Sequence, residues 1–261
     1  MKLPTERIAW IDVLKGLGIY LIYVVHLPGN TGNFNLFFMI FAVPLFFFAG
    51  GLTAQRSKER PFRVFLRDKT QKILIPYFAF GLLTMAVRMI VLPESKLGEL
   101  IGWTKQLALG RRNNLFAASL WFLPCYFCVT LLYHGLQRVL KNQWLLLGVC
   151  TVLSLAVRFS IDAPLLPWGL DSAVRYLFYY ALGDVLITPI ERARNDGLNR
   201  GEKLIFAAVT GGVLWLNLLN YLYGRGYIPG LFGVTLDFNG QVIELIGMAL
   251  VGLYAVVLLS L

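Results

Sequence analysis

Charged residues are scarce in this sequence of 261 residues. They make up 15% of the chain, whereas ordinary soluble domains carry about 25%. Hydrophobic residues make up 57%, and they occur in continuous runs of roughly 20 residues, the length that crosses a membrane as a helix. The composition therefore excludes a sizeable soluble domain and predicts an all-α, polytopic bundle of transmembrane helices.

The sequence also lacks the signs of two other membrane-directed classes. Its apolar runs are continuous, whereas a β-barrel would show alternating segments of about ten residues. No small-x-small cleavage site follows the N-terminal basic residues, and the first apolar run contains Asp12 and Lys15, which argues against a secretory signal peptide. We therefore expect the first span to be retained.

Cysteine is rare, with three residues, and each lies in an apolar stretch. Cys125, Cys128 and Cys150 are therefore expected to pack as small hydrophobic side chains. The segment "CYFC" has the C-x-x-C spacing, but no second cysteine pair or nearby histidine completes a metal site. We expect no metal centre.

Eight apolar runs are predicted to span the membrane within a single membrane domain over residues 1–261. They cover residues 8–27, 36–54, 73–92, 119–137, 144–160, 173–190, 203–222 and 242–261. The segment after the third run has apolar residues at helical spacing from Leu97 to Leu107, which predicts a helix along the interface. The chain stops inside the apolar run "VVLLSL", so either the last span is short or its continuation is missing.

Basic residues collect in links between the spans and give the chain a formal net charge of +10. The link 55–72, "QRSKERPFRVFLRDKTQK", holds seven basic residues against two acidic ones, and the positive-inside rule places it in the cytoplasm. Basic links at 138–141 and 192–203 fall on the same side by alternation, so both termini are predicted to be cytoplasmic. Charge in these places is expected to set topology and to attract anionic membrane lipid or a phosphate-bearing cofactor, not nucleic acid.

The first span, "IDVLKGLGIYLIYVVHL", contains three ionisable residues. At 100° per residue, Asp12, Lys15 and His26 share an arc of about 80° with two isoleucines. Such groups usually face the bundle interior or a wet cavity, because a charge at the bilayer centre costs about 2.5 to 3.5 kcal/mol. The alternative is that Asp12 and Lys15 snorkel to one interface and His26 lies at the other.

Spacing along this helix decides which of the three residues can pair. Lys15 and His26 are eleven residues apart, about 16 Å along the axis, so they cannot touch. Asp12 and Lys15 are three residues apart and form the feasible ion pair. Lys15 and His26 must therefore act on different ends of a bound molecule.

Five blocks of sequence carry a resemblance to a known family. They are the Lys15 and His26 pair with ten residues between, then "VPLFFFAGGL", "KTQKILIPY", "SLWFLPCYF" and "LDSAVRYLFYYALGDVL". In this order they resemble the acyltransferase 3 family of bacterial integral membrane O-acyltransferases, whose signature is an Arg or Lys, ten residues and a His. The last two blocks are similar to its fucose 4-O-acetylase-like branch, whereas Lys69 and Lys72 stand where the family's block has arginines.

The resemblance implies transfer of an acyl group, usually acetyl, from cytoplasmic acetyl-coenzyme A to a hydroxyl of a cell-envelope carbohydrate. It also implies a multi-pass protein of the bacterial inner membrane. His26 would be the general base for the hydroxyl or would carry the acyl group covalently. Lys15 would bind the donor's pantetheine arm or stabilise charge on the thioester oxygen, and Asp12 would orient Lys15.

The donor's polyanionic nucleotide end would be bound by the cytoplasmic link. Lys69, Lys72 and Arg67 lie where this link meets the third span and are expected to clamp the phosphates of acetyl-coenzyme A. Each of these cations could instead serve only as a topology signal. Two other functions stay open: a transporter or flippase for a polar or lipid-linked substrate, and a non-catalytic relative of the family.

Overall fold

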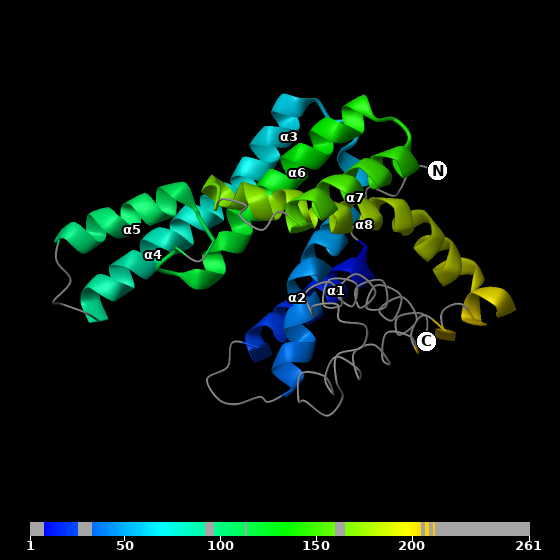
Figure 1. Cartoon of the computed structure of the whole chain (residues 1–261), viewed down its shortest axis with the longest axis horizontal. Helices are drawn as coiled ribbons and strands as arrows, with labels where there is room; N and C mark the ends of the chain where they lie inside the picture. Colours follow the sequence, from blue (N-terminus) through cyan, green and yellow to red (C-terminus); the bar gives the residue numbers. More distant parts are fainter. Residues whose placement is uncertain are drawn as a thin grey trace. The chain divides into compact units, whose positions relative to one another are not determined.

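The computed structural model describes residues 8–25, 33–91, 97–112, 114–159, 165–204, 207, 208 and 211. Over these residues the chain is helical and contains no strand, which confirms the predicted all-α class (Figure 1). The α-helices are α1 (Ala9–Val25), α2 (Asn33–Gly51), α3 (Phe62–Lys69), α4 (Ile75–Val91), α5 (Leu97–Leu109), α6 (Phe122–Val139), α7 (Gln143–Phe159) and α8 (Leu170–Asp196).

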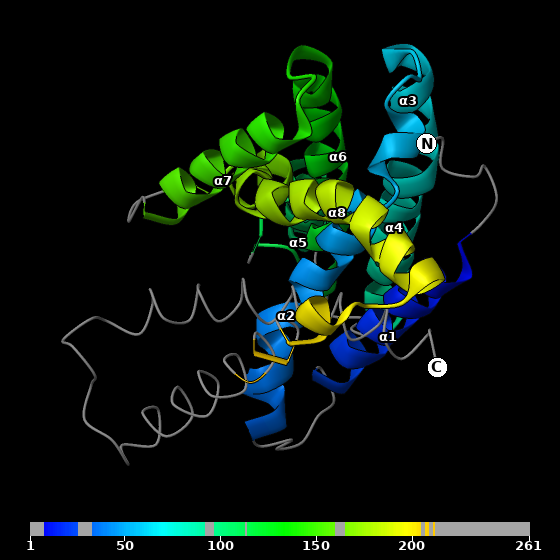
Figure 2. The same cartoon turned by 90° about the vertical axis from the view of Figure 1, so that its right-hand side faces the viewer.

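The helices belong to two compact units of the chain. The terminal unit comprises Met1–Thr53 and Gly183–Leu261, and the central unit comprises Ala54–Leu182. Helix α8 begins in the central unit and ends in the terminal unit. Figure 2 shows α1 beside α2 in the terminal unit, where these two helices make extensive contact.

In the terminal unit, the C-terminal part of α8 packs directly on α2. A Cβ atom added at Gly183 would lie 2.3 Å from the carbonyl oxygen of Phe48 and 2.9 Å from the backbone nitrogen of Leu52. The indole Nε1 of Trp10 donates a hydrogen bond of 2.8 Å to Oε1 of Glu191, which ties α1 to α8. Residue 183 must therefore be glycine for the two backbones to approach this closely.

A substitution at Gly183 tests this close approach. We expect Gly183→Ala to lower the free energy of unfolding by about 1–3 kcal/mol, because backbone atoms cannot move aside as a flexible side chain would. Gly16→Ala in α1 is the matched control, since a Cβ atom there meets nothing within 4 Å. Alanine is the better helix former by up to about 1 kcal/mol, so this control should be neutral or stabilising. Thermal unfolding in detergent measures both, and equal effects would contradict the packing.

In the central unit, α3 and α4 are parts of one continuous helix from Phe62 to Val91. The turn between them, Thr70–Leu74, is π-helical, and the N–H of Ile75 bonds to the carbonyl of Thr70. Pro76 explains this turn, because a proline has no N–H and its ring would clash with the carbonyl four residues earlier in an α-helix. The sequence predicts a link over 55–72, but the structure makes its second half a helical extension of the third span.

Six of the eight predicted spans correspond to helices α1, α2, α4, α6, α7 and α8. Two helices of the described residues, Phe62–Val91 and Ser119–Val139, are long and apolar enough to cross a membrane. The predicted spans 203–222 and 242–261 lie largely outside the described residues. The count of eight spans and the cytoplasmic termini therefore stay predictions.

The predicted interfacial segment is also helical, as α5, but it packs on α4 through much of its apolar surface. Trp103 and Leu107 are buried there, whereas Ile101 is 63% exposed. A Cβ atom at Gly81 of α4 would lie 2.3 Å from a methyl carbon of Leu107, so the two helices approach closely (Figure 1). The hydroxyl of Tyr77 donates a hydrogen bond of 2.6 Å to the carbonyl of Leu107.

Candidate functional site

Two of the three predicted catalytic residues lie on α1 in the terminal unit. Asp12 and Lys15 are both half-buried and one turn apart. The fully buried face of α1 is formed by their neighbours Ile11 and Leu14, whereas Ile19 is 61% exposed. The predicted charged stripe therefore borders the core of this unit and does not fill it.

His26 lies outside the described residues. Its part in the site, as a base or as an acyl carrier, stays a prediction. The predicted donor-binding residues Lys69, Lys72 and Arg67 belong to the central unit, so the structure places the two sets of candidates in different units.

The donor-binding candidates lie on the helical extension of the third span. The Nζ atom of Lys69 lies 5.3 Å from the centre of the Phe65 ring. The Nζ atom of Lys72 forms an ion pair of 2.7 Å with Oδ1 of Asp68, and its side chain is still 69% exposed. Arg67 is exposed. Three cations within six residues of one helix give this segment a local positive potential that attracts a polyanion.

An aromatic stack holds this cationic helix against α6. The Phe65 ring lies parallel to the imidazole of His134, with 4.0 Å between ring centres and 9° between planes. His134 is 2% exposed, and neither ring nitrogen has a hydrogen-bond partner. One turn along α6, Nη2 of Arg138 donates a hydrogen bond of 2.8 Å to the carbonyl of Arg60. These contacts fix the start of the cationic helix to the end of α6.

Arg56 is a further candidate that the sequence did not single out. It lies at the start of the same basic link, in the short helix Ala54–Ser57. Its Nε and Nη2 atoms are buried without a hydrogen-bond partner. Buried cationic donors without partners are costly, so an anion at this position would be favourable. The only sequence signal for Arg56 is its membership of the basic link.

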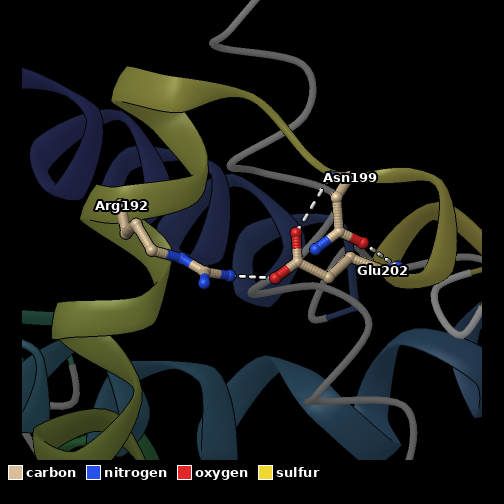
Figure 3. Close-up of polar contacts among 3 residues, drawn as sticks. All are labelled: Arg192, Asn199 and Glu202. Carbon is tan, nitrogen blue, oxygen red and sulfur yellow. Dashed lines mark hydrogen bonds and ion pairs between the residues drawn. The ribbon is translucent and has the colours of Figure 1, made fainter.

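A second basic link, in the terminal unit, is organised by Glu202 (Figure 3). The backbone N–H of Asn199 donates a hydrogen bond of 2.9 Å to Oε2 of Glu202, and the backbone N–H of Glu202 donates one of 2.8 Å to Oδ1 of Asn199. This reciprocal pair is a capping box, which satisfies two amides at a helix start. Arg192 forms an ion pair with the other oxygen of the same carboxylate.

The capping box changes the acidity of its carboxylate. The hydrogen bond from the Asn199 backbone, helped by the Arg192 guanidinium, lowers the pKa of Glu202 below its ordinary value, although burial opposes this shift. A lowered pKa means that the ionised form stabilises the fold. This contribution is complete above the ordinary pKa of glutamate and is lost as the pH falls through the lowered value.

Hydrogen exchange of the Asn199 and Glu202 amides tests this pH dependence. In the wild type, we expect protection of these amides, corrected for intrinsic exchange, to fall as the pH drops below the ordinary range of glutamate. Glu202→Gln keeps a hydrogen-bond acceptor but cannot titrate, so its protection should not change over the same range. Identical pH profiles in the two proteins would contradict the assignment to Glu202.

The described part of the chain is all-helical. Two of its helices are long and apolar enough to cross a membrane, and one of these carries the cations at 67, 69 and 72. A family model described as an acyltransferase domain, that of the acyltransferase 3 family, matches residues 8–261. No curated protein and no solved structure matches the chain. The chain belongs to the acyltransferase 3 family, which is membrane-associated, and the family indicates an acyltransferase activity with an acyl donor and an acceptor.

Proposed function

We propose that this protein is an integral membrane O-acetyltransferase of the bacterial inner membrane. It would move an acetyl group from acetyl-coenzyme A to a hydroxyl of a cell-envelope carbohydrate. The observation that carries the proposal is the family match over residues 8–261, which includes the Lys15 and His26 signature. The fucose 4-O-acetylase-like blocks favour a sugar hydroxyl as the acceptor.

The reaction replaces a thioester bond by an ester bond. A hydroxyl is a poor nucleophile until a base removes its proton, and imidazole titrates in the right range for this task. His26 takes the proton while the hydroxyl oxygen bonds to the acyl carbon, the C–S bond breaks, and the proton passes to the departing thiolate of coenzyme A. In the covalent alternative, a ring nitrogen of His26 attacks the thioester carbon, the C–S bond breaks, and coenzyme A leaves as a thiol with the proton of the imidazole. The hydroxyl oxygen then attacks the acyl carbon, the bond from this carbon to the imidazole nitrogen breaks, and the hydroxyl proton returns to the imidazole.

Lys15 supports this chemistry from helix α1. Its half-buried position on α1 suits a cation that stabilises negative charge on the thioester oxygen or holds the pantetheine arm, because a charge acts more strongly away from bulk water. Asp12, one turn before it, would orient the ammonium. The eleven-residue spacing of Lys15 and His26, about 16 Å along the span predicted from the sequence, would suit a long donor arm that passes between them.

The phosphates of coenzyme A would bind the cationic helix and Arg56. Lys69, Lys72 and Arg67 offer three cations within six residues of one helix, and Arg56 offers buried donors that lack partners. Lysine binds phosphate as a point charge, whereas arginine can form two parallel hydrogen bonds. The lysines at 69 and 72 therefore favour a donor site that is weaker and more sensitive to salt than one built from arginines.

Labelled acetyl-coenzyme A tests the catalytic roles. We expect His26→Ala and Lys15→Met to lower acetyl transfer to envelope glycans at least about 100-fold, the usual contribution of a positioned acid–base or charged group. Lys15→Arg should retain most activity, since the family signature accepts either residue. Lys141→Met, which removes an exposed cation from another cytoplasmic link, is the matched control and should act like the wild type.

Three outcomes would decide against these roles. If His26→Ala still acetylates the glycan at the wild-type rate, a catalytic role for His26 is contradicted. Substrate uptake without chemical change would favour a transporter. A wild-type protein that neither acetylates nor transports would favour a non-catalytic relative.

The donor site is tested separately by steady-state kinetics. We expect the double variant Lys69→Met, Lys72→Met to raise KM for acetyl-coenzyme A about tenfold or more with little change in kcat, because these cations would bind the donor far from the reacting atoms. Lys69→Arg with Lys72→Arg should lower this KM and weaken its dependence on salt. Equal losses of kcat in both double variants would show a structural role for these positions instead.

A further inference from the structure

The central unit contains a cavity of about 690 Å³ beside α4 and α5. Its lining comes from the end of α4, one face of α5 and the segment 111–116 that follows α5. The volume lies in the range of small-molecule sites, about 300–1,000 Å³. None of the residues already assigned to the donor or to catalysis lines it.

The cavity is cationic and partly aromatic. Arg88, Lys105 and Arg111 line it together with Trp103 and Phe116, and none of the lining residues that the structure describes is acidic. The guanidinium carbon of Arg88 lies 5.6 Å from the centre of the Trp103 ring and 5.9 Å from that of Phe116. These ring contacts hold the guanidinium in place, and three positive charges without a negative one favour an anionic ligand.

Two buried polar atoms of the lining residues lack hydrogen-bond partners. One is a donor, Nε of Arg111, and the other is an acceptor, Oε1 of Gln106. Each atom would lose a hydrogen bond to water without replacement, which costs about 1–3 kcal/mol. An anion without a hydroxyl group, such as sulfate, could satisfy only the donor, whereas a ligand with both an anionic oxygen and a hydroxyl group could satisfy both atoms.

The walls of the cavity are rigid. Helices α4 and α5 meet closely at Gly81 and Leu107, and the Tyr77 hydroxyl joins them through its hydrogen bond to Leu107. The chain turns after α5 at Gly110, which has a φ of +56°, a value that favours glycine. The indole Nε1 of Trp168 donates a hydrogen bond of 2.9 Å to the carbonyl of Ala108 beside this turn. A site held in this way is formed before its ligand arrives.

The cavity and the donor-binding cations lie at opposite ends of one helix. Lys72 and Arg88 are sixteen residues apart in the continuous helix Phe62–Val91, about 24 Å along its axis. The fifteen residues between them include no charged side chain. By the predicted topology, this end of the helix is the outer one, so the cavity is a second anion site and not part of the coenzyme A site.

We propose that this cavity binds an anionic sugar of the acyl acceptor. Its phosphate or carboxylate would contact Arg88, Lys105 and Arg111, and a hydroxyl would donate a hydrogen bond to Oε1 of Gln106. This inference rests on the proposed acetyltransferase function, because it gives that reaction its acceptor site. It names the substrate class as an acidic glycan and not a neutral one.

Direct binding tests the proposal without any acyl transfer. The protein is placed in nanodiscs of phosphatidylcholine, and glucose 1-phosphate, glucose and sulfate are titrated by calorimetry. We expect glucose 1-phosphate to bind at least about tenfold more tightly than glucose or sulfate. Lys105→Gln and Arg111→Gln should each weaken this binding about tenfold or more. Lys105 is exposed, so its loss should leave the fold intact.

Arg112→Gln is the matched control. Arg112 is the neighbour of Arg111 but does not line the cavity, and its guanidinium lies 5.5 Å from the centre of the Trp121 ring. Its loss should leave the affinity for glucose 1-phosphate unchanged. An equal loss in Arg112→Gln would show a diffuse charge effect and overturn the proposal, as would equal affinity for sulfate and glucose 1-phosphate.

Two further experiments are needed. One distinguishes a sugar from a lipid headgroup as the ligand, and the other distinguishes failure of the cavity proposal from failure of the proposed acetyltransferase function. In the first experiment, phosphatidylglycerol is added to the nanodiscs. If it abolishes the binding of glucose 1-phosphate by occupying the cavity, the cavity is a lipid headgroup site and the inference is overturned. In acetyl transfer to an acidic glycan, Lys105→Gln should raise KM for the glycan and not for acetyl-coenzyme A. Sugar binding without transfer would contradict the proposed function alone, whereas transfer without sugar binding would contradict the cavity alone.

Discussion

The cost of placing charge in an apolar environment governs the organisation of this protein. A charged side chain at the centre of a bilayer is costly, so charges in such a chain collect at the ends of helices or in protected sites. The continuous helix Phe62–Val91 shows this directly, because fifteen uncharged residues separate Lys72 from Arg88. Both ends of one rigid element thereby become cationic, and each end suits a different anionic group.

Rigid contacts between helices keep these charged ends in place. At one end, the parallel rings of Phe65 and His134 and the hydrogen bond from Arg138 to the Arg60 carbonyl hold the cationic helix on α6. At the other end, the close approach of α4 and α5 at Gly81 supports the second cationic site. These contacts therefore hold both cationic ends of the helix Phe62–Val91 against neighbouring helices.

Sequence reasoning was sufficient for the elements whose signal is local. The apolar runs predict six helices of the described residues, since length and hydropathy alone define a spanning helix. The prediction of a link before the third span was wrong in its second half, which is helical. This segment is highly charged although its Phe65 is buried, and a proline such as Pro76 usually ends a helix, so the sequence favours a link. The π-helical turn that accommodates Pro76 has no simple sequence signal.

The candidate site, like the fold, has some features that the sequence predicts and others that only the structure shows. The Lys15 and His26 pair and the basic link are visible in sequence, because their spacing and clustering lie within single segments. The stacking of Phe65 on His134 and the cavity that contains Arg88, Lys105 and Arg111 join separate helices, so only the three-dimensional structure reveals them. The unsatisfied donors of Arg56 and Arg111 likewise depend on burial, which the sequence does not encode locally.

The most direct test of the account is the fate of the acetyl group itself. The purified wild-type protein, in sealed proteoliposomes with acetyl-coenzyme A and envelope glycan, should produce glycan whose mass is higher by one acetyl group, together with an equal amount of free coenzyme A. Glycan of unchanged mass, with coenzyme A still acetylated, would contradict the claim that this chain is an O-acetyltransferase.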